Sequence, residues 1–141
     1  MLLHADNFDY YGSDSAFLDD GVYASTYGAT IINDPDGVSV GKVLSLRFSG
    51  NERGIRWVLP AANATVGVAA RFYLEQIPAS DDDRPTIIQF RDGSNDRILG
   101  IRVTPTGALE AIDSGSVVVG ATTGPVLTPE AWWHIEAKFN A

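Results

Sequence analysis

The strongest constraint on the fold is an alternation of apolar and polar side chains with a period of two. It is clearest over residues 65–74, where every second side chain from Val66 to Leu74 is apolar. A strand turns successive side chains to opposite faces, whereas an amphipathic helix repeats about every 3.6 residues. The same alternation recurs over residues 43–48, 55–59, 97–104 and 132–140. These segments are therefore expected to be β-strands with one face on a core.

Shorter apolar runs are expected to add further strands at residues 8–11, 29–32, 85–91, 108–112 and 117–119. Turn sequences rich in Gly, Pro, Asp and Asn separate many of these runs. About ten short strands spaced by turns predict an all-β fold, an antiparallel β-sandwich or jelly roll. The alternation places Phe72, Trp133 and Leu46 on the core side, and we expect them to be buried.

Size and charge limit the function classes. The chain has 141 residues, which suits a single domain over residues 1–141, and its formal net charge is −8. An acidic chain is not expected to bind nucleic acid or anionic membranes, because both attract basic surfaces. Cysteine is absent, which excludes disulfides and thiolate chemistry. No apolar run approaches the roughly 20 residues of a membrane span, and no signal peptide is visible.

The last predicted strand, residues 132–140, is followed by Ala141 alone. A strand with an apolar face needs backbone partners and a covered core side, so we expect this strand to lie inside a sheet. We also expect the domain to be truncated at its C-terminal end, with further strands belonging to a longer protein. The alternative is that another chain supplies them.

Several short segments occur in an order that is shared with one group of β-sandwiches. They are Asp6-Asn7-Phe8-Asp9-Tyr10-Tyr11, Leu46-Arg47-Phe48, Ala70-Arg71-Phe72-Tyr73, Ile87-Ile88-Gln89-Phe90-Arg91-Asp92-Gly93, Ile101-Arg102-Val103 with Thr106-Gly107-Ala108-Leu109, and Trp132-Trp133-His134-Ile135-Glu136-Ala137-Lys138-Phe139. Over nearly its whole length the chain resembles the concanavalin-A-like, or laminin-G-like, sandwich of lectins and glucanases. Within that group it resembles structural proteins of tailed bacteriophages and gene transfer agents. Family members continue with further strands, which supports the expected truncation.

The resemblance implies a virion structural protein without enzymatic activity: a spike, fibre or decoration subunit with a role in host adhesion. Such a protein is made in the bacterial cytoplasm and assembled into the phage or phage-like particle. Its implied partners are other virion proteins, further copies of itself in a homo-oligomer, and a host polysaccharide. The alternative is a carbohydrate-binding module that recognises a host surface or capsular glycan. A glycoside hydrolase is a more distant alternative, because the chain lacks the closely spaced carboxylates of the glucanases of this fold.

Calcium is common in lectins of this fold, and no other cofactor is expected. Asp92, Asn95 and Asp96 offer clustered oxygen ligands in one loop, and the segment Asp34-Pro35-Asp36-Gly37 offers a second set. Asp, Asn and Gly are also the residues of plain turns, because they tolerate the required backbone angles. A calcium site and an ordinary turn are both open interpretations of these loops.

Arginine is the most informative charged residue, since eight of the ten basic residues are Arg. Period-two phasing places Arg47, Arg71 and Arg102 on the non-core side of predicted strands, as it does Tyr73 and Trp132. One interpretation is local pairing with the many aspartates. The other is a single face that binds an acidic glycan or an acidic partner, because guanidinium binds carboxylate through two parallel hydrogen bonds. These five residues form the predicted ligand-binding site.

Overall fold

A computed structural model of the chain describes residues 30–33, 42–45, 65–80, 82, 84–121 and 126–140. The chain divides into two compact units, Met1–Pro60 and Ala61–Ala141, and each is described by itself. Within the described residues every regular element is a β-strand, and every strand pairing is antiparallel. The predicted all-β antiparallel class is therefore confirmed. No helix in this part of the chain is long and apolar enough to span a bilayer.

The described part of the first unit is one pair of strands. β1 (Thr30–Asn33) pairs antiparallel with β2 (Lys42–Ser45), with Ile31 opposite Leu44. β1 lies at the short apolar run predicted at residues 29–32, and β2 overlaps the alternating segment predicted at residues 43–48. The strands predicted at residues 8–11 and 55–59 lie outside the described residues, as do Leu46 and Arg47.

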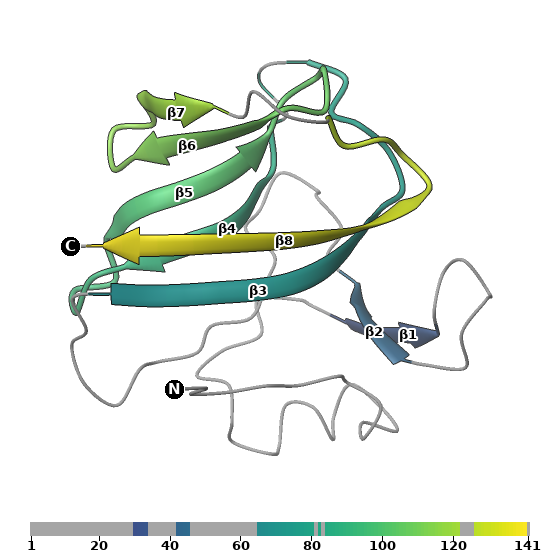
Figure 1. Cartoon of the computed structure of the whole chain (residues 1–141), viewed down its shortest axis with the longest axis horizontal. Coiled ribbons are helices and arrows are strands. Elements are labelled where there is room, and N and C mark those ends of the chain that lie inside the picture. The colour runs from purple at the N-terminus through teal and green to yellow at the C-terminus, as the bar shows by residue number, and fades with distance from the viewer. Residues whose placement is uncertain are drawn as a thin grey trace. The chain divides into compact units, whose positions relative to one another are not determined.

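In the second unit, β3 (Thr65–Leu74) and β8 (Ala131–Asn140) form a two-stranded sheet. All ten residue pairs follow one register without a shift, from Thr65 opposite Asn140 to Leu74 opposite Ala131. In Figure 1 the two strands run side by side as the long teal and yellow arrows. Within the described residues β8 has a strand neighbour on one side only, so the interior position predicted for it is not seen there.

The other four strands of this unit form a meander in the order β4-β5-β6-β7. They are β4 (Thr86–Arg91), β5 (Arg97–Val103), β6 (Leu109–Asp113) and β7 (Val118–Ala121). Consecutive strands pair with each other, as Figure 1 shows. All four lie at runs that the sequence predicted, with ends shifted by one or two residues.

The three connections of this meander share one construction. In each loop the side-chain oxygen of the first residue accepts the backbone N–H of the residue four positions later. The acceptors Asp92, Thr104 and Asp113 bind the amides of Asp96, Ala108 and Val117 at 2.9, 3.1 and 2.9 Å. The fourth loop residue has a positive φ, which is 70° at Asn95, 79° at Gly107 and 66° at Ser116. Loops of this kind connect antiparallel neighbours with little strain in the flanking strands.

Both sheets of the second unit contribute to one hydrophobic core. The buried members are Ile88, Phe90, Val103, Leu127 and Ile135, from β4, β5, the 126–130 segment and β8. The Phe90 ring on β4 stacks on the Phe139 ring of β8, with centroids 5.5 Å apart. The apolar sides predicted for β3, β5 and β8 are the ones that pack here, so the predicted phase of these strands is confirmed.

Phe72 and Trp133 lie opposite each other at the rim of this core and are half-buried, not buried as predicted. The indole nitrogen of Trp133 donates to the carbonyl of Thr128 at 3.2 Å. Because the indole N–H needs a polar partner, the ring lies at the core boundary and not at its centre. Its cross-strand neighbour Phe72 lies at the same boundary.

Candidate functional site

The outer face of β3–β8, the side away from the shared core, is a ladder of five cross-strand pairs. From one end to the other they are Tyr73 and Trp132, Arg71 and His134, Ala69 and Glu136, Gly67 and Lys138, and Thr65 and Asn140. Three of the five predicted ligand-binding residues, Arg71, Tyr73 and Trp132, come together at one end of it. The prediction could not place His134 and Lys138 beside them, because alternation assigns a face but no neighbours.

The aromatic end of this face positions Arg71. The guanidinium carbon of Arg71 lies 5.0 Å from the centroid of the Trp132 ring, a cation–π contact. Tyr73 packs against the other part of Trp132, with ring centroids 5.5 Å apart at 58°. Both rings are half-buried, while Arg71 is exposed. The indole therefore restricts the rotamers of Arg71 and supports its cation at the surface.

Within the described part of the chain, no hydrogen bond or ion pair engages Arg71. A contact through the aromatic ring does not use the N–H donors in the guanidinium plane. These donors match the two oxygens of a carboxylate in spacing and direction. Among the described residues of this face, Arg71 therefore presents donors whose geometry suits an anion.

The middle of the face combines long side chains on β8 with very small ones on β3. His134 Nε2 and Glu136 Oε1 are 3.0 Å apart, and the two side chains are 58% and 74% exposed. Opposite Lys138, a Cβ added at Gly67 would meet no atom within 4 Å. Ala69, Gly67 and Lys138 are all exposed. The surface over Gly67 and Ala69 is open down to the backbone.

Arg102 does not belong to this face, so the prediction of one common arginine face is wrong for Arg71 and Arg102. Arg102 lies on β5, in the other sheet of the unit, and its Nε donates to Glu110 Oε2 at 2.8 Å. The same oxygen accepts Arg84 Nη1 at 2.7 Å. All three side chains are 17–18% exposed. For Arg102, local pairing is the correct interpretation, with a glutamate as the partner.

The outer face of β4–β7 is also closed sterically. A Cβ added at Gly100 would lie 3.1 Å from Thr86, 3.2 Å from Ile112 and 3.3 Å from Arg97. Ile112 lies on this face beside Gly100 and is 2% exposed. Side chains therefore already fill the space that a ligand would need.

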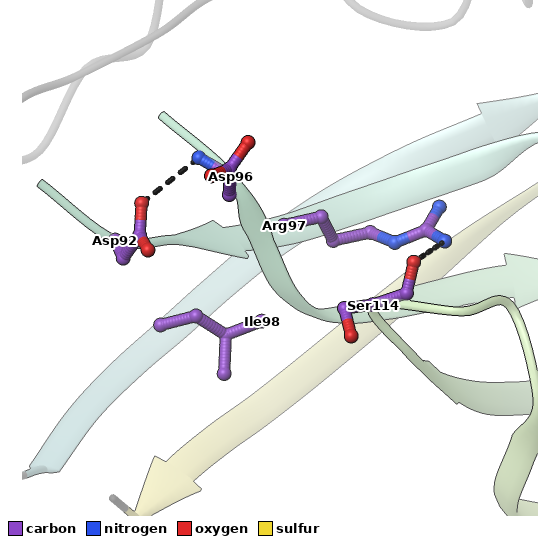
Figure 2. Close-up of a pocket in the computed structure, with 5 residues that line it drawn as sticks. All are labelled: Asp92, Asp96, Arg97, Ile98 and Ser114. Atoms are coloured by element: carbon purple, nitrogen blue, oxygen red, sulfur yellow. Dashed lines mark hydrogen bonds between the residues drawn. The ribbon is translucent and has the colours of Figure 1, made fainter. Parts of the chain in front are cut away.

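The loop predicted to be either a calcium site or a turn forms a hairpin turn. Asp92 Oδ1 accepts two backbone amides, those of Ser94 and Asp96, both at 2.9 Å. Asn95 adopts a positive φ, and its N–H donates to the Asp92 carbonyl at 3.0 Å. Figure 2 shows the open pocket beside this turn, where Arg97 also lies. The Arg97 guanidinium extends away from Asp92 and Asp96 and donates to the Ser114 carbonyl and the Ser116 hydroxyl.

No group of three or more His, Asp or Glu side chains within the described residues is close enough to hold a metal ion. Asp34-Pro35-Asp36-Gly37 lies outside them. The acidic residues of β6 are committed elsewhere, Glu110 to two arginines and Asp113 to the amide of Val117.

A second depression, of about 330 Å³, lies between β8 and the core side of the meander. Its walls are mostly apolar and include Ile101, Leu109, Ile135 and Ala137. It extends the shared core, and Glu110, Glu136 and Lys138 also line it. The outer face of β3–β8 is therefore the candidate site. No protein-family model, curated protein or solved structure matches the chain.

Proposed function

We propose that the chain is a non-enzymatic structural subunit of a phage or phage-like particle and that it adheres to an acidic glycan through the outer face of β3–β8. The proposal of a particle protein rests on the resemblance of its segments to structural proteins of such particles. The proposal of a contact face rests on one observation: Arg71 is held over Trp132 at the surface, with no carboxylate partner in the described residues.

We further propose that the domain is a concanavalin-A-like sandwich. Two antiparallel sheets that share one core, as in the second unit, are what such a sandwich requires. In this proposal the subunit acts as a spike, fibre or decoration protein, assembled with other virion proteins and with copies of itself. A module that binds a host surface or capsular glycan outside a particle is the second candidate, and it would use the same face.

Electrostatics favours short-range recognition over long-range attraction. The chain carries a net charge of −8, so an anionic polymer is repelled at a distance and must be held by direct contacts. Exposed charges are screened beyond about 8–10 Å at physiological ionic strength, which weakens that repulsion. A guanidinium–carboxylate pair operates within this range. A pre-positioned Arg71 also loses less rotamer freedom on binding than a mobile arginine would.

Binding is tested with a panel of acidic and neutral glycans on the purified chain, comparing Arg71→Gln with Arg91→Gln. Both variants remove one positive charge, but Arg91 lies on β4 in the other sheet. Loss of a charge-assisted contact of about 1.5–3 kcal/mol predicts that Arg71→Gln weakens acidic-glycan binding by at least about tenfold. Arg91→Gln is expected to bind as the parent chain does. Equal binding by the parent and Arg71→Gln would refute the proposed contact.

Assembly is tested by mass spectrometry of purified particles from a producing strain. We expect peptides of this chain at a constant ratio to other particle proteins. A chain that binds acidic glycans but is absent from particles would support the second candidate. The non-enzymatic part is tested by incubating the bound glycan with the chain, and appearance of new reducing ends would contradict it.

A further inference from the structure

We propose that the outer face of β3–β8 holds an extended polysaccharide along the strands, with anionic groups at two subsites, Arg71 and Lys138, and a neutral sugar between them. This inference rests on the proposed function, in which Arg71 binds a glycan carboxylate. To that function the inference adds two properties of the ligand, its length and the order of charged and neutral sugars along it.

The spacing of the two cations determines the length of the ligand. Arg71 is paired with His134, and Lys138 lies four residues further along β8. A strand advances about 3.3 Å per residue, so the two positions are about 13 Å apart along the sheet. The Arg71 guanidinium lies over Trp132, on the side away from Lys138, which increases the separation of the charges. One pyranose ring is too short to reach both cations.

The surface between the two subsites accommodates a chain of sugars. Ala69 and Gly67 of β3 are exposed, and no atom lies within 4 Å of a Cβ added at Gly67. Their partners on β8, Glu136 and Lys138, are long and exposed. One side of the face is therefore low and the other is raised, which forms a shallow shelf parallel to the strands. The register has no shift along this shelf, so no bulge interrupts it.

Glu136 determines which sugar lies in the middle. Its carboxylate is 74% exposed and stands between the two cations, opposite Ala69. An anionic sugar at this point would be repelled, whereas a neutral sugar can donate a hydroxyl hydrogen bond to it. The preferred ligand is therefore a polysaccharide in which acidic and neutral sugars alternate, and not one that is charged at every residue.

The experiment uses three probes: glucuronate, a hyaluronan tetrasaccharide, in which uronate and neutral sugars alternate, and an oligogalacturonate of equal length, in which every sugar is acidic. Calorimetry measures each affinity for the full chain. We expect the alternating tetrasaccharide to bind at least about tenfold more tightly than glucuronate, since it adds one charge-assisted contact. We expect the fully acidic oligomer to bind less tightly than the alternating one.

Single substitutions test the contribution of each subsite to binding. Lys138→Gln is expected to remove the gain from chain length, so that the tetrasaccharide binds about as tightly as glucuronate. Gly67→Leu, which places a large side chain on the surface between the subsites, is expected to weaken binding of the tetrasaccharide only. Glu136→Gln is expected to reduce the preference for the alternating oligomer. Each variant is compared with the parent by thermal denaturation, so that a loss of fold is not mistaken for a loss of binding.

The outcomes distinguish this inference from the function on which it rests. If Arg71→Gln abolishes binding but Lys138→Gln changes nothing at any length, the extended site is refuted and the Arg71 contact stands. If Arg71→Gln leaves every affinity unchanged, the proposed function itself is refuted. Equal binding of glucuronate and tetrasaccharide, tighter binding of the fully acidic oligomer, or no binding of any probe would each overturn the two-subsite proposal.

Discussion

On the outer face of β3–β8, Arg71 lies over the Trp132 ring, whereas on the outer face of β4–β7, Arg102 lies against Glu110. Both arginines face away from the shared core, and both strands show the same alternation of apolar and polar residues. The aromatic partner supports the cation without neutralising it, and the carboxylate partner neutralises it. The difference shows that the neighbours on the paired strand decide whether an arginine on a sheet surface keeps its charge available or has it neutralised.

Two glycines repeat the contrast in steric terms. Gly67 on β3 has open space above it, while Gly100 on β5 is enclosed by Thr86, Ile112 and Arg97. One face is therefore accessible to a ligand and the other is packed. If this comparison is correct, equivalent substitutions on the two sheets should have unequal effects on stability.

The largest effect is expected from Gly107→Ala, in the β5–β6 loop of the packed sheet. A Cβ at this position would overlap the carbonyl oxygen of Leu127, and a φ of +79° disfavours any L side chain. Because Leu127 belongs to the shared core, we expect the free energy of unfolding to fall by about 3 kcal/mol or more. Urea denaturation measures the loss.

Gly93→Ala is the matched control in the β4–β5 loop, which has the same construction. No atom lies within 4 Å of a Cβ at Gly93. The free energy of unfolding should change by less than about 0.5 kcal/mol. Equal losses in the two variants would mean that the contact with Leu127 does not fix the β5–β6 loop.

The next effect is expected from Glu110→Gln, which removes the carboxylate shared by Arg84 and Arg102. The three side chains are more than four-fifths buried, so the two cations lose a partner where water compensates poorly. After a discount for residual exposure, we expect a loss of about 2 kcal/mol. Glu136→Gln on the open face should change stability by less than about 0.5 kcal/mol. Similar losses would abolish the distinction between the two faces.

A direct steric comparison is Gly100→Ala against Gly67→Ala. The first adds a methyl group among three neighbours at 3.1–3.3 Å, and we expect a loss of about 1–2 kcal/mol. The second adds it in open space on a strand, where replacing glycine stabilises by about 0.5 kcal/mol through the unfolded state. Thermal denaturation of both variants checks the opposite signs, and a destabilised Gly67→Ala would contradict an open face.

The smallest effect on stability is expected from Arg71→Gln, although its effect on binding is large. An exposed cation–π contact contributes about 0.5–1 kcal/mol, so the melting temperature should fall only slightly. Arg102→Gln should show the reverse, a clear loss of stability with glycan binding retained in the folded fraction. A large destabilisation by Arg71→Gln would assign Arg71 a structural role instead.

Alternation predicted much of this structure because the direction of a side chain on a strand is a local property. The apolar sides of β3, β5 and β8 followed from it, and so did the outward direction of Arg71 and Arg102. It could not predict that these two residues lie on different sheets. Pairing joins residues far apart in the chain, and the packing of whole strands sets the register. The Trp132 that holds Arg71 is one such distant neighbour.

Turn composition was informative in the same limited way. It marked Asp92-Gly93-Ser94-Asn95 as a turn, which the hydrogen bonds of Asp92 confirm, and it left calcium binding open. In the β6–β7 loop the positive φ falls on Ser116, and not on the preceding Gly115. The backbone angle depends on the position of the residue in the loop. That position is set by the pairing of the flanking strands, which turn composition does not predict.

The separation of β3 from β8 in the sequence has a consequence for when the candidate site exists. The meander joins neighbours through short loops, so its strands can pair in a rapid series of local steps. The pair of β3 and β8 instead closes a long loop, in which the Thr65 side chain is hydrogen-bonded to the Asn140 side chain 75 residues away. The ladder that carries Arg71 and Lys138 is therefore expected to form last. Until β8 has paired with β3, Arg71 and Lys138 do not share one face, and the proposed contact surface does not exist.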